Sequence, residues 1–224
     1  MKNVIITGAS RGIGFDLVKV FSYNNYNIIV LSRNISPTIG IKNVKSFSTD
    51  LSSPKSIKKS IDFINSEFES VDILINNAGM LVNKPFSETT FNDFKEVFSV
   101  NVFGVAELIR LIIPKLNSNS HIINITSIGG LANTSKFSGL SAYSSSKGAL
   151  NILTEMLAEE FKETSIKINA LALGAVQTKM LDEAFPGYKA PITSVEVSKF
   201  IYDFAISGYK FFNGKTIPVS TSNP

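Results

Sequence analysis

Short apolar segments rich in β-branched residues recur along the chain and alternate with longer stretches of helical periodicity. Seven of these segments are predicted strands: residues 3–7, 27–32, 44–48, 71–76, 121–126, 166–171 and 215–219. Most are continuously apolar, which is typical of strands that are covered on both faces of a parallel sheet. Five helices are predicted between them: residues 12–24, 53–69, 90–116, 141–163 and 194–207.

Two of the predicted helices begin with recognisable start signals. Ser53 precedes Pro54, and Thr193 or Ser194 precedes Glu196, which are residues favoured at helix N-termini. The repeated strand–helix–strand units predict a doubly wound α/β fold of the Rossmann type. We expect a seven-stranded, mainly parallel sheet with helices on both faces.

Length and composition favour one globular domain. A chain of 224 residues, 44% of them hydrophobic and 18% charged, can bury a full core and commonly makes one domain, here 1–224. The net charge of +4 is spread along the chain, so no nucleic-acid footprint is indicated. The acidic residues show no metal-ligand spacing, and no metal site is predicted.

The absence of cysteine and of a targeting segment bears on where the protein acts. No Cys occurs, so neither disulfides nor thiolate chemistry is expected. A β-like run begins at residue 3 and leaves no room for a signal peptide, and the apolar runs are too short to span a bilayer. We expect a cytoplasmic protein without a membrane partner. His121, the one histidine, is expected to be a surface residue where a strand begins.

The segment TGASRGIG, residues 7–14, follows the first predicted strand and opens the first helix. Gly8 permits a tight turn, Gly12 lets the backbone approach a pyrophosphate, and Gly14 lets the helix pack closely on the strand. Free N–H groups at the helix N-terminus bind an anion. Glycines alone are weak evidence because turns need them anyway, but this strand–turn–helix setting predicts a dinucleotide site.

Tyr143 stands four residues before Lys147 in SAYSSSKGAL. One turn of helix returns both side chains to the same face, so a phenol and an ammonium would project into one site. A surface turn that carries an exposed lysine has the same pattern. The functional interpretation therefore depends on other residues that converge there.

Four further motifs accompany the glycine turn in a fixed order. They are NNAG (76–79), SVN (99–101), ITSIGG (125–130) and YSSSK (143–147). With these motifs the chain resembles the short-chain dehydrogenase/reductase family over nearly its whole length. The resemblance implies an NAD(P)-dependent oxidoreductase that transfers a hydride between nicotinamide and a carbonyl or alcohol group.

The resemblance implies catalytic roles for Asn101, Ser127, Tyr143 and Lys147. Tyr143 exchanges the proton, and Lys147 binds the nicotinamide ribose and lowers the pKa of the phenol, as a nearby positive charge does. Ser127 bonds the substrate oxygen. Asn101 kinks its helix and holds a water in a proton relay to Lys147, although an Asn in an apolar helix is more often a packing residue.

The resemblance also implies a set of cofactor contacts: Gly8, Ser10, Arg11, Gly12, Ile13, Gly14, Arg33, Asp50, Leu51, Asn77, Ala78, Gly79, Tyr143, Lys147, Val176 and Thr178. NAD-preferring relatives of this fold carry an acidic residue at the end of the second strand. Ser32 stands at that position, followed by Arg33. Two guanidinium groups, Arg11 and Arg33, can clamp a 2′-phosphate, so NADP(H) is the predicted cofactor; two ordinary surface arginines are the alternative.

The substrate region departs from the family pattern. The stretch 127–143 is longer than usual, and residues 180–193, a loop that the pattern does not place, would form a short lid over an open pocket. The family commonly pairs helices equivalent to 90–116 and 141–163 between subunits, so a homodimer or homotetramer is expected. The leading hypothesis is an NADP-dependent carbonyl reductase. A 3-oxoacyl-thioester reductase and a nicotinamide-sensing binding protein are the alternatives, and retention of Tyr143 and Lys147 disfavours the sensor.

Overall fold

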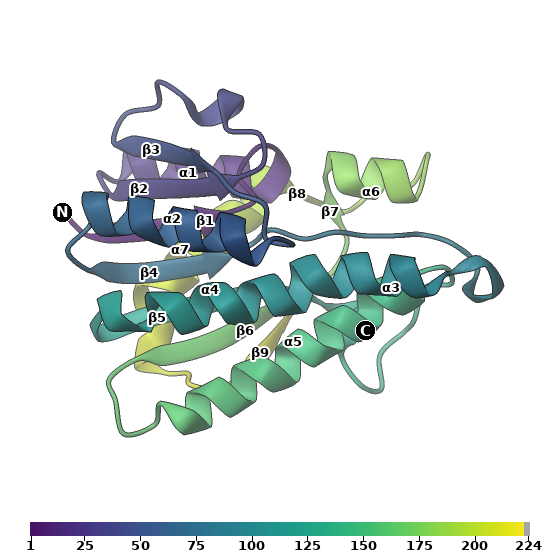
Figure 1. The fold of residues 1–224 in the computed structure, drawn as a ribbon. Helices are drawn as coiled ribbons and strands as arrows, with labels where there is room; N and C mark the ends of the chain where they lie inside the picture. Colours follow the sequence, from purple (N-terminus) through teal and green to yellow (C-terminus); the bar gives the residue numbers. More distant parts are fainter. Residues whose placement is uncertain (222–224) are drawn as a thin grey trace.

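The computed structural model describes residues 1–221, so the last three residues of the predicted domain 1–224 lie outside the described residues. A seven-stranded sheet in the order β3-β2-β1-β4-β5-β6-β9 forms its centre (Figure 1). Every neighbouring pair in this sheet is parallel. The strands are β1 (Asn3–Thr7), β2 (Asn27–Ser32), β3 (Val44–Ser48), β4 (Val71–Asn76), β5 (Leu116–Ser127), β6 (Lys167–Leu173) and β9 (Thr216–Val219).

Helices cover both faces of the sheet, which confirms the predicted doubly wound fold (Figure 1). They are α1 (Gly12–Tyr23), α2 (Pro54–Glu67), α3 (Phe91–Phe98), α4 (Gly104–Ile112), α5 (Ser141–Glu160) and α7 (Ser194–Ser207). The predicted caps are present. The Ser53 side chain accepts from the backbone N–H of Ser56, and Thr193 forms a capping box with Glu196.

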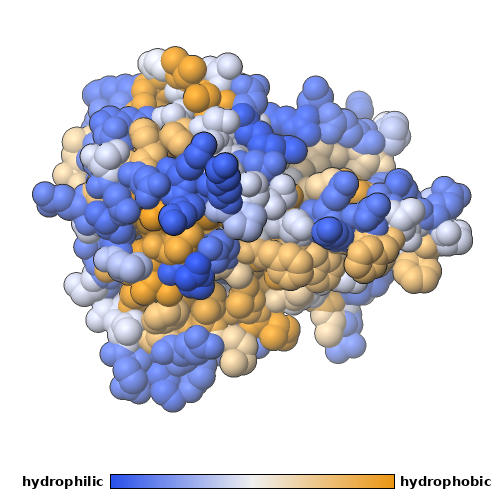
Figure 2. All heavy atoms as spheres, viewed as in Figure 1, coloured by the Kyte–Doolittle hydropathy of each residue, from blue (hydrophilic) through white to orange (hydrophobic). Residues whose placement is uncertain are grey.

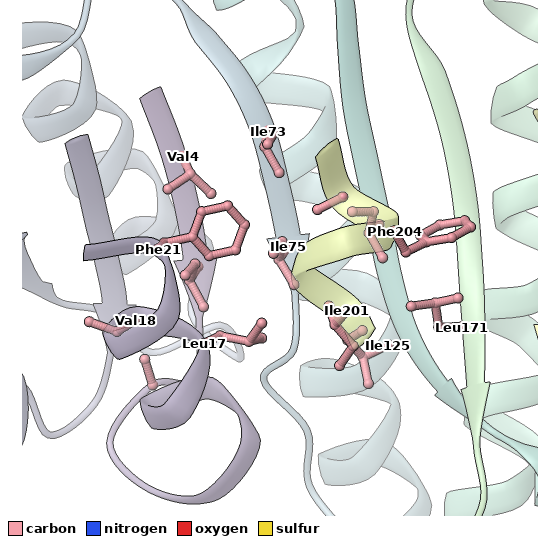
Figure 3. Close-up of a cluster of buried hydrophobic side chains, with 14 of the residues drawn as sticks. Val4, Leu17, Val18, Phe21, Ile73, Ile75, Ile125, Leu171, Ile201 and Phe204 are labelled. Carbon is pink, nitrogen blue, oxygen red and sulfur yellow. The ribbon is translucent and has the colours of Figure 1, made fainter. Parts of the chain in front are cut away.

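Alternate residues of the strands enter two separate cores, because successive side chains of a strand point to opposite faces. On β1, Val4 and Ile6 pack with α1 and α7, whereas Ile5 packs with α2, α4 and α5. Figure 3 shows the first of these cores, in which Phe21 of α1 and Phe204 of α7 lie against the sheet. Burial on both faces explains why the strands are continuously apolar in sequence.

The predicted helix 90–116 is interrupted in the structure. A π-helical segment, Ser99–Phe103, separates α3 from α4, and a 3₁₀ turn, Ile113–Lys115, ends the stretch. Among residues 1–221 this stretch, Phe91–Lys115, is the single helix long and apolar enough to cross a membrane. Core helices of soluble proteins meet the same criterion, and this stretch packs against α2 and α5.

His121 is buried, and its predicted surface position is wrong. Strand β5 begins at Leu116 rather than at residue 121, so His121 lies inside the sheet beneath α7. Its Nε2 accepts from Asn169 Nδ2 at 3.1 Å, and this assigns the ring proton to Nδ1, which lies 3.1 Å from the carbonyl oxygen of Ala205. Burial lowers the pKa of His121 to about 4. The sequence pattern concealed this position because the preceding residues are polar.

The unplaced stretch 180–193 contains structure that the pattern did not predict. Helix α6 (Lys179–Ala184) overlaps its beginning, and a short parallel pair joins β7 (Val176–Gln177) to β8 (Ile192–Thr193). Residues 180–193 are called the lid below. The lid lies beyond the carboxyl ends of the strands, beside the end of the first strand where α1 begins (Figure 1).

Candidate active site

The glycine turn between β1 and α1 requires glycine at two positions, Gly8 and Gly14. Gly8 has φ +70°, and an ideal Cβ on it would lie 2.5 Å from Cα of Ala78. A Cβ on Gly14 would lie 2.4 Å from the carbonyl oxygen of Gly8. The turn therefore approaches its surroundings by backbone alone and leaves the first N–H groups of α1 available to an anion.

The NNAG motif after β4 braces this turn. Asn77 Nδ2 donates to the carbonyl oxygens of Thr7 and Gly8, at 3.0 Å each. Thr7 Oγ1 accepts from the backbone N–H groups of Asn77 and Ala78, at 3.1 and 3.0 Å. The two loops are thus one hydrogen-bonded unit, so Asn77 has a structural role in addition to the predicted cofactor contact.

Ser32 at the end of β2 also supports the turn. Its Oγ accepts from the backbone N–H of Ala9 at 2.7 Å, and its side chain is buried. Arg33 follows with an exposed side chain. In the sequence, Ser32 stands out only as a residue that replaces a carboxylate. Its contact with the turn depends on two loops that tertiary structure brings together.

A cavity of about 670 Å³ opens at the carboxyl ends of the strands, where open α/β sheets bind ligands. It is lined by all of the predicted cofactor contacts except Gly14: Gly8, Ser10, Arg11, Gly12, Ile13, Arg33, Asp50, Leu51, Asn77, Ala78, Gly79, Tyr143, Lys147, Val176 and Thr178. Ser127 lines the same cavity, whereas Asn101 and Gly14 lie behind its wall. The structure therefore gathers residues from seven separate segments around one space.

Tyr143 and Lys147 share one face of α5, as their spacing predicts. Lys147 is buried, its Nζ lies 5.7 Å from the centre of the Tyr143 ring, and it donates to the carbonyl oxygen of Ile125 at 2.8 Å. Burial lowers the pKa of Lys147 to about 8. Burial also raises the pKa of Tyr143 to about 12, and a hydrogen bond with Ser127 opposes this shift. The phenol pKa thus moves opposite to the direction expected from a neighbouring ammonium, because desolvation outweighs the hydrogen bond with Ser127.

Ser127 ends β5 and faces the phenol. Its Oγ accepts from the backbone N–H of Gly129 at 3.2 Å and shares a hydrogen bond with Tyr143. The neighbouring Thr126 hydroxyl instead donates to the carbonyl oxygen of Leu171. Of these two hydroxyls, that of Ser127 is therefore the one beside the Tyr143 phenol.

Asn101 is buried in the π-helical segment, at the kink that the family resemblance implies. Its Oδ1 accepts from the N–H of Met80 at 2.8 Å, and its Nδ2 donates to the Met80 carbonyl and to Ser146 Oγ, both at 2.9 Å. An ideal Cβ on Gly79 would lie 3.6 Å from both Asn101 Oδ1 and Lys147 Nζ. Both amide hydrogens are thus used to join Met80, in the loop after β4, to the second turn of α5, close to the lysine.

Apart from Arg11, the side chains that hold the lid lie outside the sequence motifs. Glu183 accepts two hydrogen bonds from Arg11, and Asn83 Nδ2 donates to the carbonyl oxygen of Ala184 at 2.6 Å. The rings of Phe137 and Phe185 lie 6.3 Å apart. Neither Glu183 nor Asn83 belongs to a motif, so only the folded chain reveals these contacts.

A family model described as short chain dehydrogenase matches residues 2–189. The chain therefore belongs to the short-chain dehydrogenase/reductase family, and it is an NAD(P)-dependent oxidoreductase. This confirms the resemblance inferred from the five motifs. The site fits a nicotinamide dinucleotide, since the glycine turn leaves a backbone cradle that a Cβ at Gly8 or Gly14 would obstruct.

Individual relatives agree on the family and differ in cofactor. A fatty acyl-CoA reductase of Acinetobacter baylyi is 31% identical over 192 residues, which are 80% of this chain and 64% of that protein. Among solved structures, a 4-hydroxyisoleucine dehydrogenase complexed with NADH is 25% identical with a TM-score of 0.88, and the match covers 98% of this chain and 97% of the other. The structure of ElxO with NADP bound is 28% identical with a TM-score of 0.85, covering 97% and 96%. A nicotinamide cofactor is common to both structures.

Proposed function

We propose that this protein is an NADP(H)-dependent carbonyl reductase. The observation that carries the proposal is that Ser127, Tyr143 and Lys147 meet in the same cavity as the glycine turn and Arg33. A proton donor thereby shares one space with the residues suited to a dinucleotide. This is the arrangement that hydride transfer to a carbonyl group requires.

The chain's own residues divide the proton chemistry among them. The bound cofactor supplies the hydride. In the proposed reaction Ser127 Oγ holds the substrate oxygen, and Tyr143, whose pKa of about 12 keeps it protonated at neutral pH, donates the proton to that oxygen. Lys147, with a pKa of about 8, retains most of its positive charge and binds the ribose hydroxyls. Asn101 positions the second turn of α5 through Ser146.

Three side chains favour NADP(H) over NAD(H). Ser32 cannot accept the ribose 2′-OH as a carboxylate would, and its Oγ already accepts from Ala9. Arg33 follows it on the cavity wall, and Arg11 lies on the glycine turn. Guanidinium groups bind phosphate through charge-assisted, often bidentate hydrogen bonds.

The wall of the cavity around the lid is apolar, which supports an uncharged, apolar carbonyl substrate. Leu140, Met180, Leu181, Phe137 and Phe185 contribute to it. Apolar walls bind by excluding water, although the cation Lys179 at the start of α6 also lines the cavity. A long acyl chain would also suit such a wall, so a 3-oxoacyl-thioester substrate is the second candidate.

Binding titrations test the cofactor assignment. NADPH should bind more than tenfold more tightly than NADH, since two charge-assisted contacts supply a few kcal/mol, about 1.4 kcal/mol for each factor of ten. The Arg33→Ala variant should narrow this difference mainly by weakening NADPH. Equal dissociation constants for the two cofactors in the unmodified protein would overturn the assignment.

Steady-state assays with matched substrates test the reaction. With NADPH as reductant, apolar ketones and aldehydes should be turned over with a higher kcat/KM than 3-oxoacyl thioesters. Higher kcat/KM for the thioesters would move the assignment to the second candidate. Binding of NADPH without turnover of either class would reject the reductase proposal.

We also propose that the protein assembles as a homodimer or homotetramer through α4 and α5. The side of α5 that carries Leu150 packs into the core, whereas Ile152 and Met156 on another side are 60% and 53% exposed. Phe103, where the π segment meets α4, is 60% exposed. Figure 2 shows hydrophobic residues gathered over α3, α4 and α5. Sedimentation measurements test this proposal, and a monomer at micromolar concentration would contradict it.

A cytoplasmic location is proposed on the composition of the chain. Neither the absence of cysteine nor the mild positive charge requires an oxidising compartment or a membrane surface. Fractionation of cells that express the protein is the direct test. Recovery in the membrane or secreted fraction would contradict the proposal.

A further inference from the structure

One ion pair joins the glycine turn to the lid. Arg11 Nη1 and Nη2 donate to Glu183 Oε1 and Oε2 at 3.0 Å each, so the guanidinium and carboxylate meet in a two-pronged arrangement. The two side chains are 48% and 52% exposed. The hydrogen bonds from Arg11 hold the pKa of Glu183 below its ordinary value, so the pair is charged at neutral pH.

The start of α6 explains why these two residues meet. Thr178, whose side chain accepts from the N–H of Leu181, lies against the glycine turn: an ideal Cβ on Gly12 would be 3.4 Å from its methyl group. Glu183 follows Thr178 by five residues on the helix that begins there. Because α6 starts on the turn, its acidic residue reaches the arginine that precedes Gly12.

Consecutive lid residues contact three different segments of the chain. Glu183 binds Arg11 of the turn, Ala184 accepts from Asn83 after β4, and Phe185 faces Phe137 of the 127–143 stretch. Of these three contacts, the ion pair is the one that involves a residue predicted to bind the cofactor, namely Arg11. Arg11 is therefore shared between an observed contact with the lid and a predicted contact with the cofactor.

The guanidinium of Arg11 cannot use the same two terminal N–H groups for Glu183 and for a phosphate. Bidentate recognition of either anion takes one edge of the planar group. Glu183 retains another cation when Arg11 is withdrawn, since Lys179 Nζ lies 3.9 Å from its Oε1, one helical turn away. When Arg11 moves from Glu183 to a phosphate, Glu183 therefore still has Lys179 as a neighbouring cation.

We propose that Glu183 is a specificity-determining residue for the cofactor, because it competes with the 2′-phosphate of NADP(H) for Arg11. The proposal rests on the proposed use of NADP(H). NADP(H) takes Arg11 and releases Glu183, whereas NAD(H), which lacks the phosphate, leaves the ion pair closed. The lid over the substrate end of the cavity is consequently held less tightly in the NADP(H) complex.

The Glu183→Gln variant tests the competition, with Asp182→Asn as the matched control. Asp182 is the neighbouring lid carboxylate, and it accepts from Gln177 rather than from Arg11. Since an exposed ion pair contributes little, Glu183→Gln should lower the Kd of NADPH about two- to fivefold. The Kd of NADH should stay within about twofold, and Asp182→Asn should leave the ratio of the two constants unchanged. In an Arg11→Ala background, Glu183→Gln should have no effect on NADPH.

Hydrogen exchange of the lid gives a readout that is independent of affinity. At saturation, amides of residues 181–185 should exchange faster with NADPH than with NADH, and Glu183→Gln should remove the difference. Equal exchange in the two complexes, or a Glu183→Gln effect that is the same for both cofactors, would overturn the proposal. An unmodified protein that does not prefer NADPH would overturn the cofactor assignment itself. Retained preference without a Glu183→Gln effect would reject only the role of Glu183.

Discussion

The floor and the lid of the cavity face the same space but are held by different kinds of interaction. The floor, residues 7–14 and 76–79, is joined through backbone contacts and hydrogen bonds at Gly8, Asn77 and Thr7. The lid is held by side chains at the surface, the Arg11–Glu183 pair among them. Exposed ion pairs contribute about 0–1 kcal/mol, whereas a backbone clash in a packed region costs several times more. The floor is therefore part of the fold, and we expect the lid to open at a lower cost in free energy.

Two glycines with positive φ allow this comparison to be tested at matched positions. A Cβ at Gly8 would lie 2.5 Å from backbone of the floor, whereas a Cβ at Gly187 in the lid would meet nothing within 4 Å. Gly8→Ala should lower the free energy of unfolding by more than about 3 kcal/mol, from backbone strain and the clash together. Gly187→Ala should cost about 1 kcal/mol, from strain alone. Urea unfolding measures both, and equal losses would remove the distinction between floor and lid.

Acid should weaken the sheet beneath the floor before it weakens the ion pair of the lid. The pKa of His121 is about 4 in the folded chain and about 6.5 when unfolded, so protonation favours unfolding. Its stabilisation is complete above pH 6.5 and is lost progressively as the pH falls towards 4, with about 2 kcal/mol lost by pH 5. The hydrogen bonds from Arg11 hold the pKa of Glu183 below its ordinary value of 4.5, so the ion pair persists at pH 5.

Urea unfolding at pH 7 and pH 5 checks the histidine prediction. His121→Gln cannot take up the proton, so this variant should lose distinctly less stability between the two pH values than the unmodified protein. Both proteins retain the same carboxylates, which makes the difference specific to the imidazole. Identical pH dependence in the two would show that His121 is not the responsible group.

Tyr143 lies on α5 and not in the floor, and its side chain lines the cavity beside Ser127. Its hydroxyl should therefore matter for turnover and little for cofactor binding. Tyr143→Phe should reduce kcat at least a hundredfold, roughly the contribution of a general acid. The Kd of NADPH should change by less than about twofold. Lys147→Ala should lower kcat and also weaken NADPH binding, because the lysine is proposed to bind the ribose as well. Single-turnover rates and fluorescence titrations separate the two variants, and full activity of Tyr143→Phe would remove the tyrosine from the mechanism.

The smallest effect is expected at Asn83, which binds the lid from the floor side. Asn83→Ala removes the hydrogen bond to Ala184 at an exposed position. The global free energy of unfolding should change by less than about 0.5 kcal/mol. Amide exchange within residues 180–187 should nevertheless accelerate several-fold, because local opening depends on such contacts. A loss of global stability without faster lid exchange would show that Asn83 supports the fold as a whole and not the lid.

Elements with a strong local signal were predicted closely. Strands β1 to β4 and helix α7 have the predicted bounds, since continuous apolar runs and the Thr193 cap mark them in sequence. The four residues predicted to be catalytic were identified through motif order, and three of them line the cavity. The position of His121 was predicted wrongly because burial there depends on α7 and β6, which are distant in sequence. Helix α6 was missed because six residues carry too little periodicity.

The sequence by itself determined the sheet, the glycine turn and the pairing of Tyr143 with Lys147, because each depends on residues close together in the chain. Periodicity, conformational freedom of glycine and one turn of helix are local properties, and they need no knowledge of distant segments. Only the tertiary structure decided that desolvation raises the phenol pKa, that Asn101 braces α5, and that Glu183 meets Arg11. Burial and ion pairing across 172 residues arise from packing, which no local pattern encodes.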